Sequence, residues 1–251
     1  MAHMASPALD AAVEHIRTVF AGMTSPGETG CGMCHLPEET ALLSTPGAQL
    51  PDDVLRMFAH EVPSHFDDHQ AAMRRILPQL AEQLADGRFA DLDAYDLTGL
   101  GRSGWQSWPA EQAGAVADFL HAWWTHTLNT QDEPWDAMTV FQACVTASST
   151  VTPYLARWAE QPVGGRADAC LELFVEWWID ELLDDSTNVV PWWCDHTRDE
   201  PLPELQAWIL EHAPARLRAR DADPVLLFKV GLLALPHEQR FTEETWSRAP
   251  A

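Results

Sequence analysis

Proline placement is the feature that most constrains the fold of this chain. Of its 18 prolines, seven stand just before acidic or alanine-rich runs with helical periodicity. Proline suits the first turn of an α-helix, because its missing N–H would have no intrahelical partner there. The seven are Pro7, Pro37, Pro51, Pro109, Pro134, Pro203 and Pro224. The pattern predicts a chain of many helices rather than a disordered one.

Apolar residues spaced three and four apart support this prediction. Such spacing places them on one face of a helix, and alternating strand patterns of useful length are missing. We therefore predict an all-α, multi-helix fold with fewer than about one residue in twenty in strands. The predicted helices are 7–21, 37–44, 51–61, 65–86, 90–97, 109–129, 134–147, 151–160, 167–184, 188–194, 202–213 and 223–235.

Linkers rich in glycine, serine or proline are predicted at 22–36, 98–108 and 161–166. The first four residues, Met-Ala-His-Met, resemble an expression-vector remnant, so we expect a single helical domain over 5–251. It could be subdivided into an N-terminal half, 5–98, and a tryptophan-rich half, 108–251. The segment Phe119-Leu120-x-x-Trp123-Trp124 aligns with Leu173-Phe174-x-x-Trp177-Trp178, which raises the further hypothesis of a repeat-like, solenoid-like stack.

The charge is strongly acidic, with 15 basic against 38 acidic residues and a net charge of −23. This charge disfavours nucleic acid and anionic membranes, and it would attract a basic protein or cations. It is also typical of a surface that only keeps a protein soluble. We expect a cytoplasmic protein, because we find no membrane-spanning run and no export signal, and five cysteines do not suggest a disulfide framework.

The segment Gly30-Cys31-Gly32-Met33-Cys34-His35 is the strongest candidate site. Two cysteines three apart in a glycine turn can supply half of a tetrahedral zinc site, although a redox-active dithiol or incidental free thiols fit the same letters. Haem attachment through C-x-x-C-H is rejected, because it normally follows export. The candidate metal ligands are Cys31 and Cys34, with His35, His65, Cys194 and His196 as the further choices.

Other histidines carry weaker signals. His60 and His65 are five apart with a proline between them, whereas a zincin helix needs its two histidines four apart. His69 is four residues from His65 but lies in an apolar stripe, where a packed histidine is more common than a ligand.

Four carboxylates at spacing four, Glu172, Glu176, Asp180 and Asp184, form an acidic ladder on one predicted helix. No lysine or arginine within that helix offsets them, and like charges at this spacing destabilise a helix. The ladder is interpreted as a solvated face, a docking face for a basic partner, or a cation site.

Twelve tryptophans are present, and most fall in helical stripes where core packing is expected. Trp105, Trp108, Trp192 and Trp193 fall in predicted loops, where they could line a pocket or an interface.

The stretch from Cys31 to about Leu128 resembles a group of uncharacterised proteins from high-GC Gram-positive bacteria that has no established activity. The resemblance rests on Cys31 to Glu39, the run Glu61-Val62-Pro63-Ser64-His65-Phe66-Asp67-Asp68, Arg74 to Pro78, Gly104 to Glu111, and Trp123-Trp124. It covers less than half of the chain. It implies a cytosolic helical protein in which C-x-x-C is part of a pattern, and it implies no catalytic residue.

Three functions follow from these features. The first is a zinc-binding accessory or interaction module with an acidic surface for a basic partner. The second is a metal- or thiol-dependent enzyme of specialised metabolism that uses Cys31, Cys34 and nearby histidines. The third is a structural metal knuckle without chemistry.

Overall fold

The computed structural model describes residues 5–89, 92–130, 137–186 and 201–250. Within these ranges the chain forms helices only, so the all-α prediction is confirmed. The α-helices are α1 (Pro7–Val19), α2 (Pro37–Leu43), α3 (Asp52–His60), α4 (His69–Ala85), α5 (Thr98–Arg102), α6 (Ala110–Asn129), α7 (Ala137–Ser148), α8 (Thr152–Ala159), α9 (Arg166–Leu183), α10 (Pro201–Ala219), α11 (Pro224–Leu232), α12 (His237–Arg240) and α13 (Glu243–Trp246). Two short 3₁₀ helices are η1 (Pro63–His65) and η2 (Trp105–Ser107).

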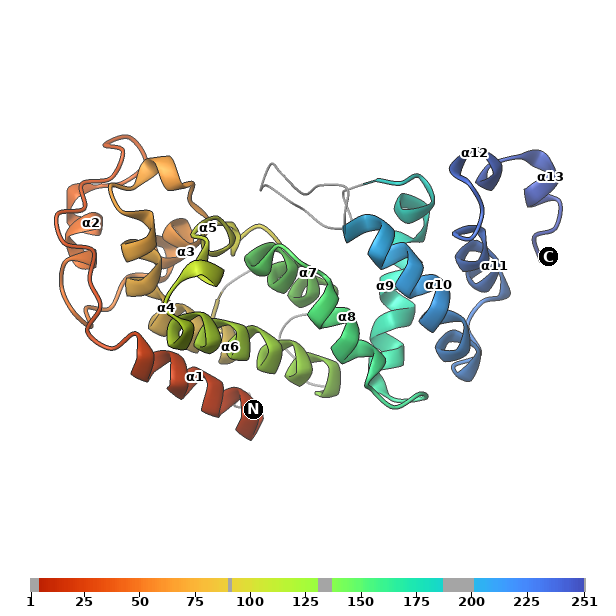
Figure 1. The fold of residues 1–251 in the computed structure, drawn as a ribbon, viewed down its shortest axis with the longest axis horizontal. Helices are drawn as coiled ribbons and strands as arrows, with labels where there is room; N and C mark the ends of the chain where they lie inside the picture. The colour runs from red at the N-terminus through yellow and green to blue at the C-terminus, as the bar shows by residue number, and fades with distance from the viewer. Residues whose placement is uncertain (1–4, 90–91, 131–136, 187–200, 251) are drawn as a thin grey trace.

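The helices form an elongated molecule whose two ends hold different parts of the chain (Figure 1). Helix α1 packs along α6 and α4, and α2, α3 and α5 cover the same end. Helices α7 and α8 lie in the middle, whereas α9 to α13 form the opposite end with the C-terminus. One hydrophobic cluster extends from Leu9 to Leu233 through both halves. The subdivision at 98–108 remains a prediction.

Several helix boundaries differ from the prediction for local reasons. Helix α4 begins at His69 rather than at residue 65, because the Asp68 side chain accepts a hydrogen bond from the Ala71 N–H and caps the helix. Helix α10 was expected to end before Pro214 but continues to Ala219. The segment predicted as helix 90–97 is not helical in its described part, 92–97.

The predicted linker 98–108 instead contains α5 and η2, which are packed into the protein. Its glycines allow close helix approach rather than flexibility. A Cβ on Gly99 would lie 2.5 Å from the Ala59 carbonyl oxygen, and one on Gly101 would overlap the Thr146 carbonyl. Trp105 and Trp108 are buried here, so the prediction that they line a pocket or interface is wrong. Trp192 and Trp193 lie outside the described residues.

The repeat-like stack is not confirmed, because the two aligned tryptophan motifs occupy different environments. In α6, Phe119, Trp123 and Trp124 are buried. In α9 the residues aligned with Phe119 and Trp123 are Leu173 and Trp177, which are exposed. The motif therefore marks an interior helix in one case and a surface helix in the other.

Buried arginines connect helices that are distant in sequence. Arg216 of α10 donates from Nη1 to Oδ1 of Asp168 in α9 (2.6 Å). Its Nη2 donates to the carbonyls of Ala159 (2.8 Å) and Gln161 (2.9 Å), where α8 ends. The Asp168 side chain is fully buried and that of Arg216 is 5% exposed. This one guanidinium therefore holds three helices together.

We expect Arg216→Ala to lower the free energy of unfolding by about 3–5 kcal/mol, because it leaves the Asp168 carboxylate buried without its cation. Urea titration followed by circular dichroism measures this loss. Arg157→Ala is the matched control, since it removes an exposed pair with Glu160 and should cost under about 1 kcal/mol. Equal losses in the two variants would contradict the assignment.

Candidate metal centre

The two cysteines lie in a tight turn that ends just before α2. Gly30 and Gly32 both adopt φ of 66°, a left-handed conformation that favours glycine. Cys31 and Cys34 are exposed, and the Cys34 N–H donates a hydrogen bond to Sγ of Cys31 (3.1 Å). The turn therefore brings both thiols to one side of the loop.

Glu28 fixes this turn against the segment that carries His65. Its buried carboxylate accepts hydrogen bonds from the backbone N–H groups of Gly30 (3.1 Å), Asp67 (2.8 Å) and Asp68 (3.1 Å). In the opposite direction, Oδ2 of Asp67 accepts from the N–H (2.8 Å) and hydroxyl (2.7 Å) of Thr29. These reciprocal bonds set the distance between the cysteine turn and η1.

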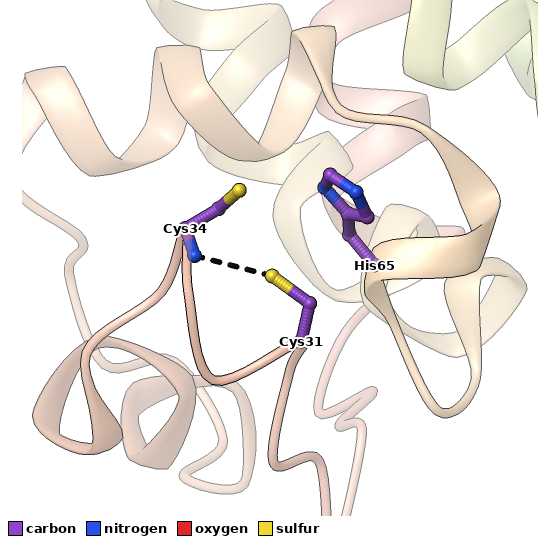
Figure 2. Close-up of side chains that lie close together, drawn as sticks. All are labelled: Cys31, Cys34 and His65. Atoms are coloured by element: carbon purple, nitrogen blue, oxygen red, sulfur yellow. Dashed lines mark hydrogen bonds between the residues drawn. The ribbon is translucent and has the colours of Figure 1, made fainter.

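His65 ends η1, and its ring faces the two sulfurs (Figure 2). The ligand atoms of Cys31, Cys34 and His65 all lie within 4.8 Å of one another. With Zn–S bonds of about 2.3 Å, two sulfurs on a tetrahedral zinc are about 3.8 Å apart. The three ligands are therefore within about 1 Å of zinc spacing. The prediction that Cys31 and Cys34 can reach one metal is confirmed.

Glu61 lies beside this group, within ion-pair distance of its histidine. Its Oε1 is 2.8 Å from Nδ1 of His65, and its Oε2 is 3.7 Å from Nε2 of the buried His35. Burial raises the pKa of Glu61, but a hydrogen bond from the Val62 N–H and the two histidines outweigh it, so the pKa falls below its usual value. Glu61 therefore remains ionised next to the imidazole.

The sequence interpretation missed Glu61 and Glu28 as parts of the site. A signal for Glu61 was present, because it stands four residues before His65 across the proline that begins η1. No local signal marks Glu28, whose partners Asp67 and Asp68 are about 40 residues away in the sequence.

Of the remaining predicted ligands, only His35 lies in the described residues, and it is not part of this group. His35 packs against Phe58 and Phe66 and is 3% exposed. Cys194 and His196 lie outside the described residues.

Two further histidines have other surroundings. The His60 ring contacts the Tyr95 carbonyl. His69 is buried, and desolvation lowers its pKa to about 4, in agreement with the packed histidine that was expected.

The two thiols differ in acidity. Hydrogen bonds from the backbone N–H groups of Cys34 and Met33 favour the Cys31 thiolate and lower its pKa to about 7. The Cys34 pKa is raised, first because its thiol hydrogen bonds to Cys31. Cys31 is therefore the thiol that loses its proton first.

Three of the four carboxylates in the acidic ladder of α9 have cationic neighbours, and these come from outside α9. Glu172 pairs with Arg220 of the α10–α11 turn (2.5 Å), and Asp180 pairs with Lys229 of α11 (2.7 Å). Asp184 lies 3.6 Å from His237. Glu176 is exposed and has no ion pair among the described residues. The cations come from later helices, so the sequence of α9 alone could not show them.

Within the described residues, the ladder does not gather enough ligand atoms for a metal, and the Cys31–Cys34–His65 group does. None of the described helices is long and apolar enough to cross a membrane. Comparisons with protein-family models, curated proteins and solved structures find no match, so the site has to be interpreted from its own chemistry.

We expect iodoacetamide to alkylate Cys31 before Cys34 in the metal-free protein, because only the thiolate reacts. The rate of Cys31 labelling should reach half of its maximum at about pH 7, the pKa of that thiol. Mass spectrometry of peptides after timed labelling over a pH series measures this order. Equal labelling of both thiols, with a midpoint near the usual cysteine pKa, would show that the turn does not stabilise the Cys31 thiolate.

The ion pairs predict opposite effects for two charge reversals in α9. Glu176→Lys should raise the free energy of unfolding by a few tenths of a kcal/mol, through new attractions to Glu172 and Asp180. Asp180→Lys should lower it by up to about 1 kcal/mol, because the lost pair with Lys229 and the new repulsion from that lysine outweigh the attractions gained to Glu176 and Asp184. Parallel urea titrations test both, and the same sign for the two variants would contradict the assigned pairs.

Proposed function

We propose that this protein binds zinc through Cys31, Cys34 and His65 and works as an accessory or interaction module with an acidic surface for a basic partner. The convergence of these three ligand atoms within 4.8 Å carries the proposal. Two thiolates and an imidazole form a donor set that suits zinc among the available divalent metals. The net charge of −23 supports the basic partner.

The surroundings of the site support a bound metal in two ways. Glu61 holds His65, as carboxylates commonly hold metal-ligating histidines. Hydrogen bonds of Glu28 and Asp67 fix the cysteine turn without a metal, so metal binding would cost little conformational entropy of this loop. Three ligands leave a fourth position, for which water, a partner side chain, or Cys194 and His196 are the candidates.

We expect the purified protein to contain about one zinc per chain by elemental analysis. Cys31→Ser, Cys34→Ser and His65→Ala should each lose it, and His60→Ala is the control that should keep it, since His60 contacts the Tyr95 carbonyl instead. Glu61→Gln should retain the stoichiometry while weakening zinc affinity about 10- to 100-fold in a chelator competition. Absence of zinc from the wild-type protein, even after reconstitution under reducing conditions, would refute the proposal.

A metal- or thiol-dependent enzyme is the second candidate. Its support is the exposed Cys31 thiolate, with a pKa of about 7, beside an incomplete ligand set. Zinc with an open position lowers the pKa of bound water to about 7, which would supply a nucleophile. Hydrolysis of ester and thioester substrates by the zinc-loaded protein, lost in Cys31→Ser, would favour this candidate over the interaction module.

A further inference from the structure

An apolar groove lies between α7, in the middle of the molecule, and α9. It has a volume of about 280 Å³, and its lining includes Met138 of α7 with Leu173, Phe174 and Trp177 of α9. Leu173 and Trp177, one helical turn apart, are 66% and 69% exposed. Large apolar side chains placed together at the surface commonly mark interaction sites, and tryptophan is enriched among residues that dominate binding energy.

The charges around the groove are arranged along α9. Arg166 lines the groove at the N-terminal end of the helix. Glu176, which has no ion pair among the described residues, stands next to Trp177, and Asp180 and Asp184 follow one and two turns later. Residues three, four and seven apart share a helix face, so the apolar pair continues directly into these carboxylates. A ligand that fits this groove would therefore combine an apolar side chain with a positive charge on one side of it.

We propose that this groove docks an amphipathic segment of a basic protein, with an apolar side chain against Leu173 and Trp177 and a lysine or arginine facing Glu176. Glu176 is the available carboxylate, because Asp180 already pairs with Lys229 and Asp184 lies near His237. A second copy of this chain is a poor occupant, because it would bring its own charge of −23 against the same carboxylates. Anionic lipid is repelled for the same reason. The inference deepens the basic-partner part of the proposed function and does not depend on the metal.

The test uses a fluorescein-labelled helical peptide of leucine and lysine, with all leucines on one face, and fluorescence anisotropy as the readout. Two comparison peptides have the same residues in scrambled order, or glutamate in place of every lysine. We expect saturable binding of the first peptide, much weaker binding of the scrambled one, and none of the glutamate peptide. Affinity should fall steeply with added salt.

Variants at exposed positions separate docking from general charge attraction. Trp177→Ala should weaken binding by about 30-fold, and Leu173→Ala should weaken it by about 10-fold, without change in net charge. Val163→Ala is the matched control, because Val163 is 59% exposed in the turn between α8 and α9, does not line the groove, and should leave affinity unchanged. Cys31→Ser should also bind as wild type, so loss of zinc and loss of docking are distinguishable.

Several outcomes would overturn the inference. Absence of binding by the wild-type protein, or equal affinity of wild type and Trp177→Ala, would show that the groove is not the contact surface. Dimerisation that Trp177→Ala abolishes, measured by sedimentation, would identify a second copy as the occupant. Trp177-dependent binding to phosphatidylcholine vesicles would identify a lipid surface instead.

Discussion

The fold depends on how the carbonyl groups at the C-terminal ends of its helices find hydrogen-bond donors inside the protein. The last carbonyls of a helix have no intrahelical donor, and burying them unpaired is costly. Arg75 donates to the carbonyls of Leu42, Thr45 and Ala48 around the end of α2. Arg216 does the same at the end of α8, and Arg240 donates to the carbonyls of Leu182 and Leu183 at the end of α9. The planar guanidinium, with five donors, reaches several carbonyls at once, which explains why arginine rather than lysine occupies these positions.

Near Cys31 and Cys34 the roles are exchanged. There a buried carboxylate accepts hydrogen bonds from backbone N–H groups, whereas the arginines donate to backbone carbonyls. Glu28 accepts from three N–H groups in two loops that have no regular structure to pair them. Glu61 then orients the ring that faces the thiols. The cysteine turn is thus held by groups that take no part in ligation, which is how a short exposed loop can present a defined ligand geometry.

Much of the fold could be predicted from local sequence, whereas its connections could not. Proline and apolar spacing located most helices, and C-x-x-C located the turn. Two of the errors share a cause, because each depended on a tertiary contact. Gly99 and Gly101 suggested a linker until their approach to Ala59 and Thr146 was known. The acidic ladder seemed to lack cations until later helices supplied Arg220 and Lys229. His65 could be named as a ligand, but Glu28 could not, since its partners are distant in sequence.

The proposed zinc site and the groove beside Trp177 would both favour a ligand that is not negatively charged. A zinc ion bound by two thiolates and a neutral imidazole has no net charge, so the cluster itself does not attract an anion as fourth ligand. The field of a chain with net charge −23 further disfavours anions, which favours water or a neutral donor from a cationic partner. The groove beside Trp177 is flanked by Glu176, and a basic occupant, as proposed, would bring the same charge. A basic protein that reaches both ends would gain from multivalency, because the second contact is intramolecular once the first has formed.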